Sequence, residues 1–161
     1  MKRKQASTLF LKMVLVLIGI AVLSLCIFGL PGMAARDAEL HPETAYLQYP
    51  FLLSAYIFFV PFFIALYQTF KLLIYIDRNK AFSGLSVRAL NAIKYCAVTI
   101  IVFIVVGEVF TIALIDGDIT HIIMLGLIGT FASSVIAIFA GLLQKLLKDA
   151  IAIKSENDLI V

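Results

Sequence analysis

The sequence is poor in charged residues, and this scarcity decides its class. Asp, Glu, Lys and Arg make up 14% of the 161 residues, compared with roughly 25% in ordinary soluble proteins. Hydrophobic residues make up 63%, well above the usual share of roughly 45–50%. A soluble domain this small leaves too much of its surface in water to hide so many apolar side chains. The composition therefore excludes an ordinary soluble domain and indicates a membrane protein.

The sequence also lacks the motifs that would support several other functions. It has no Gly-rich phosphate loop, no His-Glu metalloprotease spacing and no recognisable nucleophile arrangement. No stretch combines dense Lys and Arg with aromatic residues, so direct binding of nucleic acid is not expected. We therefore expect neither an enzyme nor a cofactor.

The two cysteines, Cys26 and Cys96, lie in different apolar runs. In the topology predicted below they are near opposite faces of the membrane, on the order of 20 Å apart. A disulfide needs Cα atoms within about 7 Å of each other. An intrachain disulfide is therefore excluded, and both residues are expected to pack as small hydrophobic groups.

Four apolar runs are long enough to cross a bilayer, which takes about 20 helical residues. They lack the alternation of polar and apolar residues that is typical of membrane β-barrels. The sequence therefore predicts an all-α, polytopic membrane protein with four transmembrane helices in a single membrane domain, 1–161. The expected helices cover residues 9–30, 50–76, 90–115 and 122–147, and a tail follows at 148–161.

The first run has two alternative interpretations. A basic start, an apolar stretch and small residues after it also describe a secretory signal peptide, but a signal core usually has 7–15 residues and this run is longer. A lipoprotein signal would need a small residue before Cys26, where Leu25 stands. We expect the first helix to be retained.

The distribution of Lys and Arg predicts the orientation, because short cytoplasmic loops are enriched in both. Cations gather at the N-terminus, in the loop between the second and third helices, and in the tail. The other two loops are mainly acidic. We therefore expect a multi-pass protein of the bacterial cytoplasmic (inner) membrane with both termini in the cytoplasm.

Two features of the helices have a structural and a functional interpretation. Pro61 lies inside the second run, where a missing N–H favours a kink, either a static bend or a hinge. The fourth run has small residues at intervals of four, which let another helix approach closely. That helix would belong either to the same bundle or to a second copy in a homo-oligomer. The four helix-packing residues are Gly129, Ser133, Ala137 and Gly141.

Glu108 is an acidic residue well inside the third apolar run. Such carboxyl groups are costly in a membrane and face a bundle interior, a water-filled cavity or a partner. The functional interpretation is a proton or cation site in a small transporter or ion-responsive protein. The structural one is a protonated carboxyl hydrogen-bonded to Thr111 or to a Tyr or Ser of the second helix.

Polar residues of the two acidic loops would resemble zinc ligands if the loops met. Ordinary loop polarity explains them equally well, so no metal site is predicted. The residues are His41, Glu43, Asp116, Asp118 and His121.

The cytoplasmic segments offer a candidate surface for a partner. The tail continues the fourth helix as a short amphipathic extension, which suits a membrane surface or a groove in a cytosolic partner. The loop after the second helix is turn-like, with serines that would cap the third helix. The partner-binding hypothesis rests on Asp77, Arg78, Asn79, Phe82, Glu156, Asn157 and Asp158.

Five segments resemble the YoaS-like family of small bacterial four-helix membrane proteins of unknown function. They are 61–68 (PFFIALYQ), 75–83 (YIDRNKAFS), 86–87 (SV), 93–96 (IKYC) and 153–159 (IKSENDL). Members of this family are often encoded beside a small helix-turn-helix regulator, so the resemblance implies such a regulator as a partner. We therefore expect a non-enzymatic regulatory or interaction protein. Alternatives are a transporter or ion-responsive protein that uses Glu108, and a structural subunit that forms oligomers.

Overall fold

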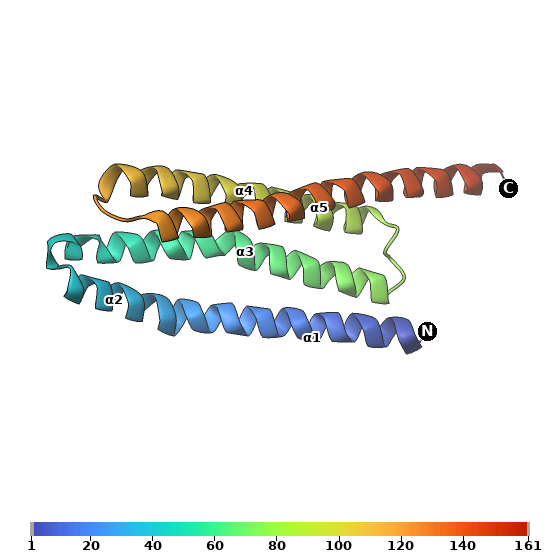
Figure 1. Ribbon diagram of the computed structural model, residues 1–161. Coiled ribbons are helices and arrows are strands. Elements are labelled where there is room, and N and C mark those ends of the chain that lie inside the picture. The colour runs from blue at the N-terminus through green and yellow to red at the C-terminus, as the bar shows by residue number, and fades with distance from the viewer. Residues whose placement is uncertain (1, 161) are drawn as a thin grey trace.

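Long helices make up almost the whole chain (Figure 1). The computed structural model describes residues 2–160, except for the side chains of Lys2 and Lys4. Within these residues, four segments are long and apolar enough to cross a membrane, so the predicted all-α, four-span architecture is confirmed. The elements are α1 (Lys2–Ser24), η1 (Leu25–Gly29), α2 (Leu30–Leu40), η2 (Pro42–Leu47), α3 (Gln48–Asp77), α4 (Gly84–Leu114) and α5 (Thr120–Ile160).

The helices extend beyond the apolar runs, and the first one extends furthest. It continues through η1 and α2 to Leu40, because residues 33–40 are rich in good helix formers. It ends there because Pro42 disfavours a helical conformation in the preceding residue. His41 accordingly has φ −127° and ψ 74°. Within α3, by contrast, Pro61 is buried and the helix continues through it to Asp77.

A π-helical turn interrupts the first span at Leu25–Gly29. Such a turn frees backbone groups from the regular ladder, and these need other partners. The hydroxyl of Tyr56 on α3 donates a hydrogen bond to the carbonyl oxygen of Cys26, 2.9 Å away. This hydrogen bond ties the π turn to the neighbouring helix. The thiols of Cys26 and Cys96 are both free.

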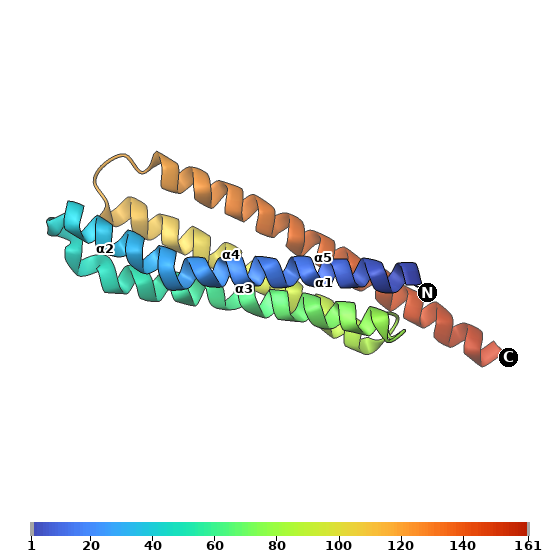
Figure 2. The same cartoon turned by 90° about the horizontal axis from the view of Figure 1, so that it is seen from below.

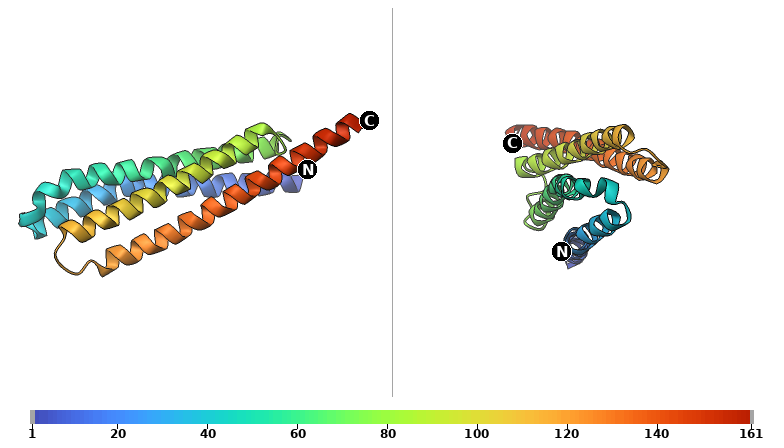
Figure 3. Two further views of the ribbon diagram at one scale, coloured as in Figure 1. Left: turned by 90° about the horizontal axis from the view of Figure 1, so that it is seen from above. Right: turned by 90° about the vertical axis from the view of Figure 1, so that its left-hand side faces the viewer.

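The spans pack in chain order and form an open bundle. α1 packs on α3, α3 on α4, and α4 on α5, which is the most extensive contact. One end of the bundle holds the N-terminus and the loop 78–83, and we call it the basic end. The other holds η2 and the loop 115–119, and we call it the acidic end. α5 crosses α4 and diverges from it toward the acidic end (Figures 2 and 3).

Most large apolar side chains point away from the protein, as expected where lipid is the solvent. Small residues dominate the interior, because helices approach each other closely in a membrane through small side chains. The buried positions gather in the basic half of α3, α4 and α5. They include Leu73, Ala89, Leu90, Ile93, Ala97 and Ala140. The basic half is thus the better-packed part of the bundle.

Candidate functional site

The loop after α3 begins with a well-formed helix cap. Asn79 has φ 58°, a left-handed conformation that Asn tolerates better than most residues. Its N–H donates to the carbonyl of Ile76 (3.2 Å), and the N–H of Lys80 donates to that of Tyr75 (2.7 Å). These two bonds define a Schellman motif. Asn79, expected at a partner surface, therefore has a structural role in ending α3.

Asp77 lies in the contact between α3 and α1. Its carboxylate is ion-paired with the ammonium group of Lys12 and accepts a hydrogen bond from the hydroxyl of Thr8. Thr8 is buried, and the Lys12 ammonium also lies 6.0 Å from the centre of the Phe70 ring. The charge that Lys12 brings into the first apolar run is thus neutralised within the bundle.

Two serines fix the remainder of the loop. The hydroxyls of Ser83 and Ser86 both donate to the carbonyl oxygen of Lys80, and the Ser86 bond measures 3.1 Å. Ser83 precedes α4 in an extended conformation without a side-chain cap. Phe82 stays 63% exposed, and Arg78 is exposed as well. Of the four loop residues expected to bind a partner, Arg78, Asn79 and Phe82 are exposed, and Asp77 is half-buried.

The C-terminal part of α5 projects beyond the bundle (Figure 1). We call residues 148–160 the arm. Except for Ala150 and Ile151, which are half-buried, every residue of the arm is exposed. The arm continues α5 without a break to Ile160. It carries the other predicted partner residues, Glu156, Asn157 and Asp158, and all three are exposed.

The small-residue ridge of α5 faces α4. A Cβ atom at Gly129 would lie 3.0 Å from Cδ1 of Ile104, and one at Gly141 would lie 3.4 Å from Cδ of Lys94. Ser133 is buried and Ala137 is half-buried. The ridge thus serves packing within one chain, which was one of its two interpretations.

Polar contacts join α4 and α5 in the basic half of the bundle. The side-chain amide of Gln144, which is buried, donates to Oδ1 of Asn91 (3.1 Å). The stem of Lys94 runs past Gly141, and its ammonium group lies 5.1 Å from the centre of the Tyr95 ring. Interhelical hydrogen bonds and lysines that reach toward the interface are typical of membrane helices. We call the whole α4–α5 contact the seam.

Glu108 lies in the acidic half of the seam, directly against Gly126. A Cβ atom at Gly126 would overlap the carboxyl group of Glu108. The Oε1 atom is buried and has no hydrogen-bond partner among the residues that the structure describes. The expected donor Thr111 instead bonds to the carbonyl of Gly107 (2.8 Å). Glu108 is thus half-buried, with one carboxyl oxygen enclosed between the two helices.

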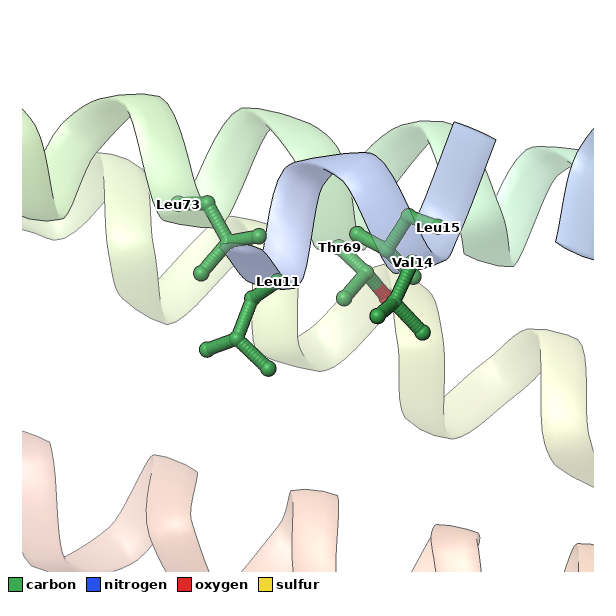
Figure 4. A pocket seen from close by; sticks show the side chains of 5 residues that line it. All are labelled: Leu11, Val14, Leu15, Thr69 and Leu73. Atoms are coloured by element: carbon green, nitrogen blue, oxygen red, sulfur yellow. The ribbon is translucent and has the colours of Figure 1, made fainter. Parts of the chain in front are cut away.

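The remaining surface features offer little to a ligand. A shallow hollow between α1 and α3 is lined by Leu11, Val14, Leu15, Thr69 and Leu73 (Figure 4). The hydroxyl of Thr69 already donates a hydrogen bond to the carbonyl of Ala65 (2.8 Å), so its proton is not available to a ligand in the hollow. A second apolar hollow lies in the seam near Phe139. Within residues 2–160, no three His, Cys, Asp or Glu side chains gather closely enough to hold a metal ion.

Comparison with known proteins agrees with this architecture. Residues 32–161 match the model of the family described as "Protein of unknown function (DUF2975)". The chain belongs to this family. The Uncharacterized membrane protein YoaS of Bacillus subtilis (strain 168) is 59% identical over 156 residues, which cover 96% of this chain and 98% of the relative. The predicted YoaS-like family is thereby confirmed. No solved structure matches the chain.

The sequence reasoning missed several residues that build these sites. Gly126 was not singled out, although it lies one turn before the ridge at Gly129. Lys12 is one of the cations near the N-terminus, and the sequence does not indicate its pairing with Asp77, which is far away along the chain. A lone cation in an apolar run is a signal for a carboxylate partner, since unpaired charge is costly there.

Proposed function

We propose that this protein is a non-enzymatic, membrane-anchored interaction protein whose arm binds a cytosolic protein. The observation that carries the proposal is the arm itself. α5 has 41 residues and is about 60 Å long at 1.5 Å per residue, whereas a hydrocarbon core is about 30 Å thick. A helix of this length, in line with a transmembrane segment, extends well beyond the lipid.

The arm carries an apolar stripe that the rest of the chain leaves uncovered. Ile153 is 60% exposed and Ile160 is 81% exposed, and residues seven apart return to nearly the same helix face. They continue the face of Leu146, which is also exposed. A helix that exposes large apolar side chains one above another is a common element for binding in a groove of another protein. We call Ile153 and Ile160 the arm stripe.

The charge distribution supports a cytosolic position of the arm. The basic end carries most of the lysines and arginines, and the acidic end carries Asp37, Glu39, Glu43, Asp116 and Asp118. The bias of basic residues toward the cytoplasm supports an orientation with both termini inside a bacterial cytoplasmic membrane. The arm continues straight from α5, which favours a protein partner over the membrane surface.

The family resemblance makes a small helix-turn-helix DNA-binding regulator the expected partner. In that arrangement the membrane protein would not contact nucleic acid itself. Binding would hold the regulator at the membrane. The exposed Phe82 and Arg78 lie at the same end of the bundle as the arm and would extend the contact surface.

Affinity capture of the full-length protein, solubilised from cells that express it, tests the proposal. We would compare the wild type with the double variant Ile153→Ser and Ile160→Ser, and identify captured proteins by mass spectrometry. A DNA-binding regulator should be recovered with the wild type. It should be lost with the stripe variant, because serine removes the apolar surface of the contact.

The chain offers a matched control for this experiment. Ala152 and Leu159 are also exposed and also seven residues apart, but they lie on a different face of the arm. The double variant Ala152→Ser and Leu159→Ser should capture the regulator as the wild type does. If deletion of residues 148–161 left the captured proteins unchanged, the arm would not be the binding site and the proposal would fail.

A further inference from the structure

Glu108 combines three features that do not occur together elsewhere in the described part of the bundle. It is acidic, it lies within a membrane-spanning helix, and one of its oxygens is buried without a hydrogen-bond partner. The facing position on α5 is Gly126, whose missing side chain leaves the space that the carboxyl group fills. A buried polar atom without a partner needs an explanation, because its desolvation is not compensated.

The surrounding elements supply no counter-charge. Along α4, the nearest charged side chain is Lys94, about 21 Å away at 1.5 Å per residue and packed at Gly141. Between Thr120 and Gln144, α5 has no Lys, Arg, Asp or Glu. The titratable groups near this half of the seam are His121 of α5, Asp116 and Asp118 of the loop, and Tyr49 and Tyr56 in the acidic half of α3, where Tyr49 is 75% exposed.

None of these groups would stabilise an ionised Glu108. His121, Asp116 and Asp118 are exposed at the acidic end, and the two aspartates carry the same charge as the carboxylate. The hydroxyl of Tyr56 donates to the carbonyl of Cys26. With the seam closed, an ionised Glu108 would thus have one oxygen buried within a membrane-spanning helix without a counter-ion, which is unfavourable.

We infer that Glu108 is a proton-binding site whose occupancy sets how closely the acidic half of α5 packs against α4. With the proton bound, the neutral carboxyl group lies against Gly126 and the seam is closed. When the proton leaves to water, the carboxylate must reach solvent. The end of α4 at Leu114 is about 9 Å away along the helix, so the shortest route to water leads toward the acidic end.

The packing of the seam determines which part of it moves. In the basic half, Gln144 is bonded to Asn91 and Ala140 is buried. In the acidic half, α5 diverges from α4 (Figures 2 and 3), and the side chain of Glu108 spans the space between them. Ionisation therefore separates the acidic half while the basic half stays packed. The ligand is a proton, and the response is a change in the distance between the two helices.

Pulsed electron paramagnetic resonance measures this distance directly. Spin labels at Leu114 and Leu125, both exposed, would report on the acidic half in lipid nanodiscs, in a background with Cys26→Ala and Cys96→Ala. The distance should lengthen by several ångströms between acid and alkaline pH. Labels at Val98 and Ile138, also exposed, report on the basic half and should show no change.

Two variants assign the response to Glu108. Glu108→Gln keeps the shape of the side chain but cannot ionise, so its distance should stay short at every pH. His121→Asn removes the imidazole at the start of α5, and it should keep the wild-type shift. In each variant, an unchanged distance between the labels at Val98 and Ile138 shows that the bundle is folded.

Several results would overturn the inference. One is a distance between Leu114 and Leu125 that is the same at acid and alkaline pH. Others are a pH shift that persists in Glu108→Gln or disappears in His121→Asn. Exchange of sodium for potassium at constant pH should have no effect, and a change of distance there would identify a metal cation as the ligand instead.

Discussion

The ammonium group of Lys12 and the carboxylate of Asp77 pair across the contact between α1 and α3. The pair joins the start of the first span to the end of the second, and the Thr8 hydroxyl bonds to the same carboxylate. Both charged side chains are largely shielded, with 21% and 25% of their side-chain surface exposed. The contact therefore contributes to the fold, although Asp77 belongs to a segment with family resemblance.

Replacement of Asp77 by alanine should destabilise the bundle by about 1–3 kcal/mol, because it leaves Lys12 partly buried and without its carboxylate. Unfolding by SDS in mixed micelles measures the change in free energy. A second substitution, Lys12→Met, should recover part of the loss because it removes the unpaired charge. If the cost of the double variant equalled the sum of the costs of Asp77→Ala and Lys12→Met, the pair would not be coupled.

Asn79 should tolerate glycine but not a residue that avoids positive φ. Its φ of 58° suits glycine, so Asn79→Gly should keep the stability close to that of the wild type. Asn79→Ala should cost about 1 kcal/mol. The same SDS titration compares them, and captured partners should be equal for both variants if the residue acts through the turn alone.

Gly126→Ala should force the carboxyl group of Glu108 out of its place, since the new Cβ would overlap it. Relative to Gly107→Ala, where a Cβ meets nothing within 4 Å, the substitution should be unfavourable by about 1 kcal/mol. The difference should disappear in a Glu108→Ala background, which removes the overlapping atoms. A penalty that persists there would assign the effect to other neighbours of Gly126.

Asp118 makes the start of α5 sensitive to acid. Hydrogen bonds from the side chain and the backbone of Thr120 lower the pKa of its carboxyl group, and His121 adds to this; the Thr120 N–H lies 3.0 Å from Oδ1. A lowered pKa means that the fold favours the ionised form. The stabilisation is therefore complete above the unfolded value of about 3.9 and is lost as the pH falls through the folded one.

Nuclear magnetic resonance of the Asp118 side chain in nanodiscs checks this prediction. Thr120→Val removes the hydroxyl group but keeps the backbone N–H, so the pKa of Asp118 should move part of the way back toward its usual value. Asp118→Asn should lower the protection of the first turn of α5 against hydrogen exchange, and this protection should no longer fall when the wild-type carboxylate would be protonated. A pKa unaffected by Thr120→Val would contradict the assigned cause.

The spans were predictable from the sequence because the bilayer imposes one simple demand, about 20 apolar residues in a helix. The extension of the first helix to Leu40 was not predicted, because helix propensity decides it outside the apolar run. The turn at Asn79 was expected from its residue types, but its Schellman bonds depend on backbone geometry.

The partners of buried polar groups were harder to predict. Thr8 and Asp77 are joined by a hydrogen bond across 69 positions, and no periodic pattern connects residues so far apart. Thr111 was a reasonable donor for Glu108 by its spacing, yet in a helix its hydroxyl finds the carbonyl of Gly107 one turn earlier. The role of Gly126 depends on the packing of α5 against α4, which places this glycine opposite the carboxyl group of Glu108.

The packing of the spans in chain order has a consequence for biogenesis. Each helix contacts the span made before it, so assembly can follow synthesis from the ribosome, one segment after another. Contacts between near neighbours in sequence favour fast folding, because little loop entropy is lost in forming them. α5 is made after α4 and finds its docking surface there. A truncated chain that stops after α3 would already contain a complete α1–α3 contact, with Lys12 and Asp77 in place.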